Sequence, residues 1–126
     1  MTTNGTGNTA DAHTAIMNGS GMHNKPAKVI TLCGSMRFQK TFEAVQKRLT
    51  LEGCIVLCPL FPAPDDPPIS DEQLALLRKL HLQRIDMADE VLVINADGYI
   101  GSQTQKEIEY ARSKGKKITY LEVANT

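Results

Sequence analysis

Two kinds of hydrophobic pattern alternate along the chain from about residue 28 onwards. Short runs dominated by Val, Ile, Leu and Cys are typical of buried strands, and they occur at residues 28–33, 54–58, 90–95 and 117–122. Between them, apolar residues recur at the spacing of one helix face, over residues 38–51, 70–87 and 103–113. The pattern therefore predicts the element order β-α-β-α-β-α-β.

The ends of the helical stretches carry their own signals. Gly53 and Gly115 follow the first and third stretches and are expected to end them, because Gly readily adopts the conformation that closes a helix. The long middle stretch is expected to bury a stripe that includes Leu74, Leu77, Leu80 and Ile85. Residues 59–70, which precede it, carry five prolines and cannot form regular structure.

Alternation of strands and helices implies a parallel sheet with right-handed crossovers. We expect a small doubly wound, Rossmann-like α/β domain over residues 27–126, with four strands and three helices. The outer face of so small a sheet can need a second copy to cover it, which predicts a homo-oligomer, most simply a dimer. Residues 1–26 lack a periodic apolar pattern and are expected to form a flexible tail.

The amino-acid composition limits which partners, ligands and cell compartment are to be expected. The 126 residues include 14 Lys and Arg against 14 Asp and Glu, so net charge does not point to a nucleic-acid polymer or an acidic membrane as partner. No run approaches the roughly 18 apolar residues of a membrane span, and the N-terminus lacks the pattern of a secretory signal. The cysteines are Cys33, Cys54 and Cys58. Their odd number and the lack of a matching Cys/His pair predict reduced thiols, no metal, no cofactor and a cytoplasmic protein.

Three loops follow the first three strands, and in a parallel sheet such loops meet at the carboxyl edge, where ligands bind. The first contains Cys33, Gly34, Ser35 and Arg37. Gly34 permits a tight turn, Ser35 and the following amides can donate to an anion or a sugar hydroxyl, and Arg37 can pair with a phosphate. The alternative is an ordinary helix start, with Ser35 as the N-cap and Arg37 in solvent.

The second loop is the proline-rich segment 59–70. Its prolines, its aspartates and Phe61 can form a stiff lid over a planar base, although a plain surface connection is at least as common. Asp65 and Asp66 can bind a metal or a hydroxyl, but adjacent carboxylates on a loop are usually solvated.

The third loop covers residues 95–104 and precedes the last helix. Asn95 ends a strand and is expected to point into the site. Tyr99 can stack on a base or pack on the surface, and Gly101 belongs to the same turn. Ser102 and Thr104 supply hydroxyls beside amides at a helix N-terminus, a position that suits a phosphate.

Glu107 is open to two interpretations. The sequence Thr104-x-x-Glu107 fits a capping box in the first turn of the helix, where the Glu side chain bonds back to the amide of the cap residue. Alternatively, a carboxylate beside an anion-binding loop can act as a nucleophile or a base. The pattern alone favours the structural interpretation, because capping boxes are much commoner than catalytic glutamates.

His81 lies in the middle of the long predicted helix, on a face near Arg84 and Ile85. It can face the ligand cleft as a proton shuttle or as a partner of Glu107. A partly exposed surface histidine is an equally common outcome.

Several segments, taken in order, resemble the nucleoside 2-deoxyribosyltransferase superfamily, which includes 2'-deoxynucleoside 5'-phosphate N-hydrolases and cytidine monophosphate hydrolases. They are residues 30–37, residues 88–94, the loop and helix that carry Glu107, and residues 116–122. The resemblance covers roughly residues 28–122 and points to the nucleotide N-hydrolase-like branch.

The resemblance implies a role for Glu107 as the nucleophile that attacks the anomeric carbon of the sugar. It also implies that the turn at Gly34 and Ser35 holds the sugar or phosphate end, and that Ser102 and Thr104 bind a 5'-phosphate. Family members usually carry an aspartate where this chain has His81, and an aromatic residue near the place of Cys33.

Taken together, the residues and the resemblance predict an N-glycosidase that cleaves the base–sugar bond of a nucleoside or nucleoside 5'-monophosphate, with Glu107 and His81 in catalysis. A base-exchange transferase and a non-catalytic nucleotide-binding module are the alternatives.

Overall fold

The computed structural model describes residues 25–123, and residues 1–24 and 124–126 lie outside this part. The predicted tail, residues 1–26, therefore falls almost wholly outside the described residues, and the domain division at residue 27 stays a prediction. Within residues 25–123, no helix is both long and apolar enough to cross a membrane.

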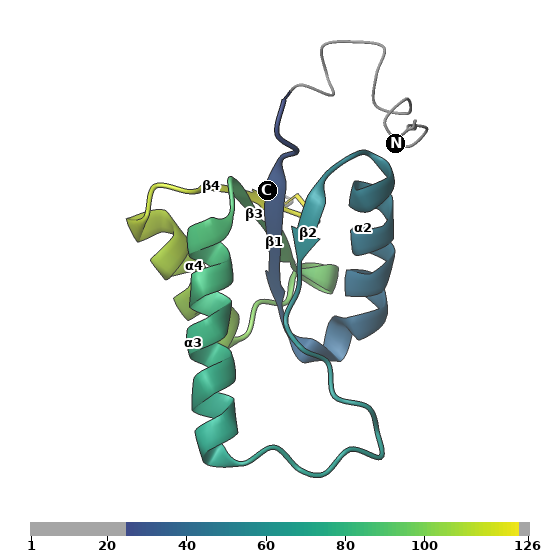
Figure 1. Ribbon diagram of the computed structural model, residues 1–126, viewed down its shortest axis with the longest axis vertical. Coiled ribbons are helices and arrows are strands. Elements are labelled where there is room, and N and C mark those ends of the chain that lie inside the picture. Colours follow the sequence, from purple (N-terminus) through teal and green to yellow (C-terminus); the bar gives the residue numbers. More distant parts are fainter. Residues whose placement is uncertain (1–24, 124–126) are drawn as a thin grey trace, which may run out of the picture.

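The predicted alternation of strands and helices is confirmed (Figure 1). The strands are β1 (Val29–Gly34), β2 (Ile55–Leu57), β3 (Glu90–Ile94) and β4 (Lys117–Tyr120). The α-helices are α2 (Gln39–Leu51), α3 (Asp71–Met87) and α4 (Ser102–Ser113). Two single turns of 3-10 helix that the sequence did not indicate follow strands: η2 (Met36–Phe38) and η3 (Ala96–Gly98).

All four strands are parallel, in the spatial order β2-β1-β3-β4. The chain leaves β1 toward β2 on one side and returns to β3 on the other. The carboxyl ends of β1 and β3 are therefore the topological switch point, where doubly wound sheets bind their ligands. The paired residues Cys33–Val93 and Gly34–Ile94 lie at this point.

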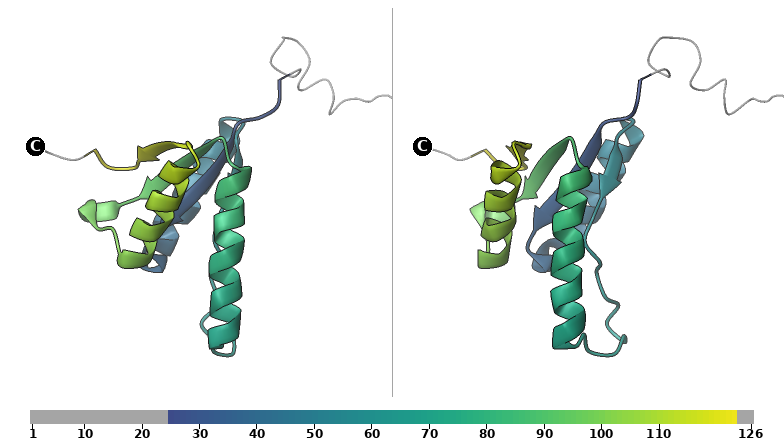
Figure 2. Two further views of the ribbon diagram at one scale, coloured as in Figure 1. Left: turned by 90° about the vertical axis from the view of Figure 1, so that its left-hand side faces the viewer. Right: turned by 60° about the vertical axis from the view of Figure 1, so that its left-hand side comes forward.

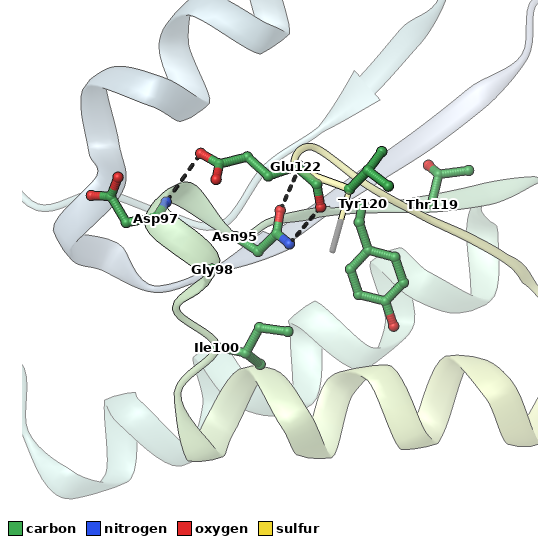
Figure 3. A pocket seen from close by; sticks show the side chains of 8 residues that line it. Asn95, Asp97, Gly98, Ile100, Thr119, Tyr120 and Glu122 are labelled. Carbon is green, nitrogen blue, oxygen red and sulfur yellow. Dashed lines mark hydrogen bonds between the residues drawn. The ribbon is translucent and has the colours of Figure 1, made fainter. Parts of the chain in front are cut away.

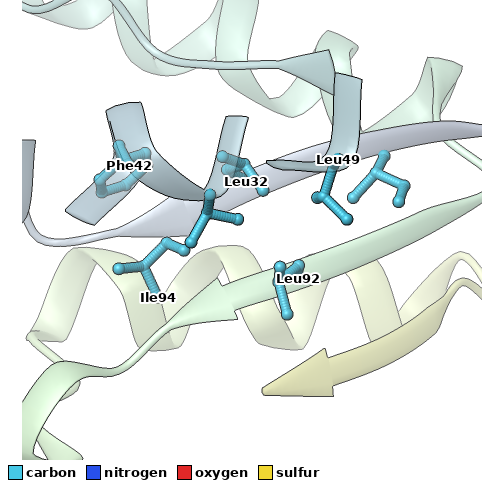
Figure 4. Close-up of a cluster of buried hydrophobic side chains, with 7 residues drawn as sticks. Leu32, Phe42, Leu49, Leu92 and Ile94 are labelled. Atoms are coloured by element: carbon cyan, nitrogen blue, oxygen red, sulfur yellow. The ribbon is translucent and has the colours of Figure 1, made fainter. Parts of the chain in front are cut away.

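Alternate residues of the central strands pack on opposite faces of the sheet. On one face, Leu32 and Ile94 pack with Phe42 and Leu49 of α2 (Figure 4). On the other face, Cys33 and the odd-numbered residues of β3 pack with buried side chains of α3 and α4. The second face is the one that carries the candidate site, because Cys33 lies on it.

Helix α3 departs from the predicted core stripe. Ile85 is fully buried, but Leu74 and Leu80 are 39% and 36% exposed, so their assignment to the core is wrong. The reason is length: the N-terminal half of α3 extends past the end of the sheet (Figure 2). A capping box between Ser70 and Gln73 starts the helix at this distant end. The predicted homo-oligomer stays a prediction.

The end of β1 approaches its neighbours closely at Gly34. A Cβ atom added there would lie 2.8 Å from the carbonyl oxygen of Ile94 and 3.1 Å from the ring of Phe42. These neighbours are strand backbone and a packed core ring, so neither can move aside cheaply. Gly34 is thus required by the packing that joins β1 to β3.

We expect Gly34→Ala to reduce the free energy of unfolding by about 1–3 kcal/mol, the usual range for overpacking. Urea unfolding followed by circular dichroism measures this change. Gly101→Ala is the matched control, since the added atom would meet the hydroxyl of Tyr99 at 3.2 Å and the adjoining ring carbons at 3.5 Å or more, and that side chain can shift. An equal loss in both variants would contradict the packing argument.

Candidate active site

A cavity of about 600 Å³ opens at the carboxyl ends of β1 and β3. Its walls come from the turn after β1, the proline-rich segment 59–70, the inner face of α3 and the start of α4. This is the topological switch point of the sheet, and the volume lies within the usual range for small-molecule sites.

Three buried side chains meet beneath this cavity, each from a different element. They are Cys33 at the end of β1, His81 in α3 and Glu107 in α4. His81 Nε2 lies 3.4 Å from Cys33 Sγ and 3.7 Å from Glu107 Oε1. The side chains of His81 and Glu107 are only 5% and 10% exposed. The predicted partnership of His81 with Glu107 is therefore present in the structure.

Arg84 determines which nitrogen of His81 carries the proton. Its Nη1 lies 3.2 Å from His81 Nδ1. A guanidinium can only donate hydrogen bonds, so Nδ1 accepts and the proton of the neutral ring is on Nε2. The Nε2–H group therefore points toward the thiol of Cys33 and the carboxylate of Glu107.

Burial displaces the pKa values of all three groups. The pKa of His81 falls to about 4, because burial disfavours the imidazolium and the charge of Arg84 adds to this effect. Burial raises the pKa of Glu107, opposed by hydrogen bonds from Cys33 and Gln103 and by the charge of Arg78. Burial, together with the neighbouring carboxylate, also raises the pKa of the Cys33 thiol. At neutral pH, His81 and Cys33 are thus uncharged donors around Glu107.

Glu107 does not cap its own helix. The N-cap of α4 is Gly101, and no side chain bonds to the cap amides. Because α4 begins at Ser102, Thr104 is a buried residue of the first turn and Glu107 lies in the second turn. The predicted first-turn position and the capping-box interpretation are both wrong. The carboxylate of Glu107 is therefore free to face the cavity. Among the described residues, no side chain bonds to the first amides of α4.

Most of the residues expected at the site lie around this cavity. Six of the candidate binding residues do line the cavity with His81 and Glu107; they are Gly34, Ser35, Tyr99, Gly101, Ser102 and Thr104. Cys33 lies behind the cavity wall and is fully buried. Arg37 reaches the site only through Tyr99, whose ring lies 4.0 Å from the guanidinium carbon.

Arg78 and Gln103 were not among the residues expected at the site, and Arg84 was expected only as a neighbour of His81. All three line the cavity. Arg78 and Arg84 lie three residues before and after His81, so helical spacing places them on the face that His81 presents to the cavity. This helical spacing in the sequence could have identified both arginines as residues of the cavity.

Asn95 lies elsewhere, in a second hollow of about 710 Å³ beside β4 (Figure 3). Its Nδ2 donates to the carbonyl oxygen of Glu122 at 3.0 Å, and its Oδ1 accepts from the amide of the same residue at 2.8 Å. The Glu122 carboxylate also accepts from the amide of Asp97. Asn95 therefore holds the segment after β4 in place through hydrogen bonds, and it does not line the cavity that contains Glu107.

The proline-rich segment forms one wall of the cavity through Pro59, Leu60, Pro62 and Ile69. Phe61 packs against Phe42 of the core, with ring centroids 5.0 Å apart, so its predicted part in a lid is wrong. The Asp66 carboxylate accepts the amide of Ala63 at 2.8 Å and stabilises a local turn.

No family model matches the sequence, and no curated protein matches it either. The fold is similar to that of a 2-deoxyribosyltransferase from Bacillus psychrosaccharolyticus, with 22% identity, a TM-score of 0.60 and coverage of 77% of each chain. It is also similar to a 2-deoxyribosyltransferase from Leishmania mexicana, with 17% identity and a TM-score of 0.56, covering 74% of this chain and 63% of that one. The chain therefore has a nucleoside deoxyribosyltransferase-like fold, as the sequence resemblance predicted; membership of the superfamily and of one of its branches stays a prediction.

Proposed function

We propose that the protein is an N-glycosidase that cleaves the base–sugar bond of a nucleoside 5'-monophosphate through Glu107. The observation that carries this proposal is the Glu107 carboxylate itself, which is buried at the floor of a nucleotide-sized cavity and is not used as a helix cap. A carboxylate in such a place, free to meet a ligand, is typical of a catalytic group.

In the proposed reaction, Glu107 attacks the anomeric carbon and displaces the base, and water then hydrolyses the glycosyl-enzyme, as in retaining glycosidases. For this attack, the Glu107 carboxylate must be ionised and held in a fixed orientation. The Cys33 thiol supplies a hydrogen bond that favours the ionised carboxylate, and His81 Nε2 lies 3.7 Å from Glu107 Oε1. His81 is neutral, so it serves here as an oriented donor rather than as a charged acid.

Charge around the cavity supports a phosphate on the substrate. Arg78 and Arg84 line the cavity, and Glu107 is the only carboxylate among residues 25–123 that lines it with them. The first amides of α4 have no side-chain cap, and the Ser102 hydroxyl lies beside them. An uncapped helix N-terminus together with two arginines suits a phosphate better than an uncharged ribose.

A second candidate is base exchange between nucleosides. The observation that favours it is the similarity of the fold to two 2-deoxyribosyltransferases. The two reactions share a glycosyl-enzyme and differ in what resolves it, water or a second base. Incorporation of a labelled free base into a nucleoside would identify the exchange reaction.

We expect release of free base from at least one nucleoside 5'-monophosphate, and we expect Glu107→Gln to lower kcat/KM about a thousandfold or more. Chromatography of ribo- and deoxyribonucleosides and their 5'-monophosphates measures this release. Glu109→Gln is the control, because Glu109 lies on the same helix with its carboxylate exposed. Turnover that persists in Glu107→Gln would contradict the assigned nucleophile, and ligand binding without turnover would favour a non-catalytic binding module.

We also expect the ring of His81 to stay neutral, with its proton on Nε2, down to a pH near its pKa of about 4. Removing the neighbouring charge in Arg84→Met should raise this pKa toward the ordinary value of about 6.5. Nitrogen-15 NMR of the histidine rings during a pH titration measures both quantities. The exposed Arg112→Met is the control. A His81 that titrates near pH 6.5 in the unaltered protein would contradict the described environment.

A further inference from the structure

The buried cluster of Cys33, His81 and Glu107 brings together three kinds of metal-ligating atom. A thiol sulfur, an imidazole nitrogen and a carboxylate oxygen all lie within 4.8 Å of one another. The sulfur and nitrogen atoms lie 3.4 Å apart, and the nitrogen and oxygen atoms lie 3.7 Å apart. Tetrahedral zinc with bonds of about 2.0–2.3 Å places neighbouring ligand atoms roughly 3.3–3.6 Å apart.

We propose that Cys33 Sγ, His81 Nε2 and Glu107 Oε1 form a binding site for Zn²⁺ or a similar divalent cation. Sulfur, nitrogen and oxygen ligands in a tetrahedral arrangement suit zinc, whereas magnesium and calcium prefer oxygen alone. His81 and Glu107 line the cavity, so the fourth coordination position faces it. Three protein ligands and one open position form the usual arrangement of a reactive zinc centre.

The three ligands are held by the core, so little reorganisation is needed to bring them together. Cys33 is fully buried, and Ile85 and Ile108, on the same helices as the other two ligands, are 0% and 1% exposed. The hydroxyl of Thr31 donates to the carbonyl oxygen of Arg84 at 2.8 Å and ties α3 to β1 beside the cluster.

The charge balance of the occupied site also favours a divalent cation. Binding would release the thiol proton to solvent, giving a thiolate, while Glu107 contributes a carboxylate. The two negative charges balance Zn²⁺, so the occupied site carries no net charge in a place where burial penalises charge.

Arg84 opposes the binding of a cation at this site. The proton of His81 must leave Nε2 for the metal to bind there and must move to Nδ1, which now accepts from Arg84. The guanidinium must therefore turn away, and its charge repels a cation. Arg84 is only partly buried and lines the cavity, so it has room to turn. The Arg84 contact thus weakens metal binding without preventing it.

If Glu107 is the nucleophile proposed above, metal binding and catalysis exclude each other, because both use the same carboxylate. This consequence rests on the proposed function, whereas metal binding itself does not. Zinc is then expected to inhibit base release, and a chelator is expected to restore it.

Cobalt(II) is the probe for the site, since a thiolate–Co²⁺ bond gives a charge-transfer absorption band that oxygen and nitrogen ligands alone do not give. We expect the full-length protein, purified with chelator, to bind one equivalent of Co²⁺ with this band and to lose the band when Zn²⁺ is added. Cys33→Ser should abolish the band, and the double variant Cys54→Ser, Cys58→Ser should retain it. Thermal melts identify any variant that fails to fold.

Arg84→Met provides a second test that needs no change in the ligands. It should tighten Zn²⁺ binding by about tenfold or more, the scale of effects from groups that contact a metal ligand. The proposal is overturned by the absence of a thiolate band, by a band that persists in Cys33→Ser, or by an unchanged affinity in Arg84→Met. None of these readouts depends on base release, so the proposed function and the metal site can fail separately.

Discussion

The candidate site depends on one constraint, which is that the Glu107 carboxylate is buried away from water. The Glu107 side chain is 10% exposed, and an unpaired carboxylate at such burial would take up a proton. The neighbours act against that outcome: the thiol of Cys33 and the side-chain amide of Gln103 donate to the carboxylate, and the charge of Arg78 also favours its ionised form. His81 Nε2 lies 3.7 Å from it. The His81 donor depends in turn on Arg84, whose guanidinium fixes the tautomer. Three elements of the fold, β1, α3 and α4, therefore contribute to the surroundings of one carboxylate.

The fold itself could be predicted from sequence almost completely. The β-branched runs indicated all four strands, and Gly53 and Gly115, which adopt φ values of 96° and 71°, end the helices where expected. The expected burial of residues 54–58 was wrong, because β2 lies at the edge of the sheet and Ile55 is 51% exposed. The prediction was wrong where a local pattern has two structural solutions. The leucines of α3 repeat with helical spacing along its length, but periodicity gives the face of a helix and not how far the sheet extends beneath it.

The sequence indicated most of the residues that line the candidate site, but it indicated few of the contacts between them. Topology alone brings the loops after β1 and β3 together, which is why Ser35, Tyr99 and Ser102 were placed correctly. The capping role of Thr104 was wrong because a capping box depends on the first residue of the helix, and a shift of one or two residues removes it. The Cys33 contact with His81 spans 48 residues of sequence, so no local motif could have indicated it.

The proline-rich wall of the cavity has a consequence for how a ligand is bound. Residues 59–70 have no regular secondary structure, so backbone hydrogen bonds do little to hold them in place. Their five prolines instead restrict the backbone before the chain folds, so less conformational entropy is lost when the wall forms. The same stiffness limits what a ligand must immobilise on entry. For a ligand bound in this cavity, binding free energy that a glycine-rich wall would lose to ordering would be retained as affinity.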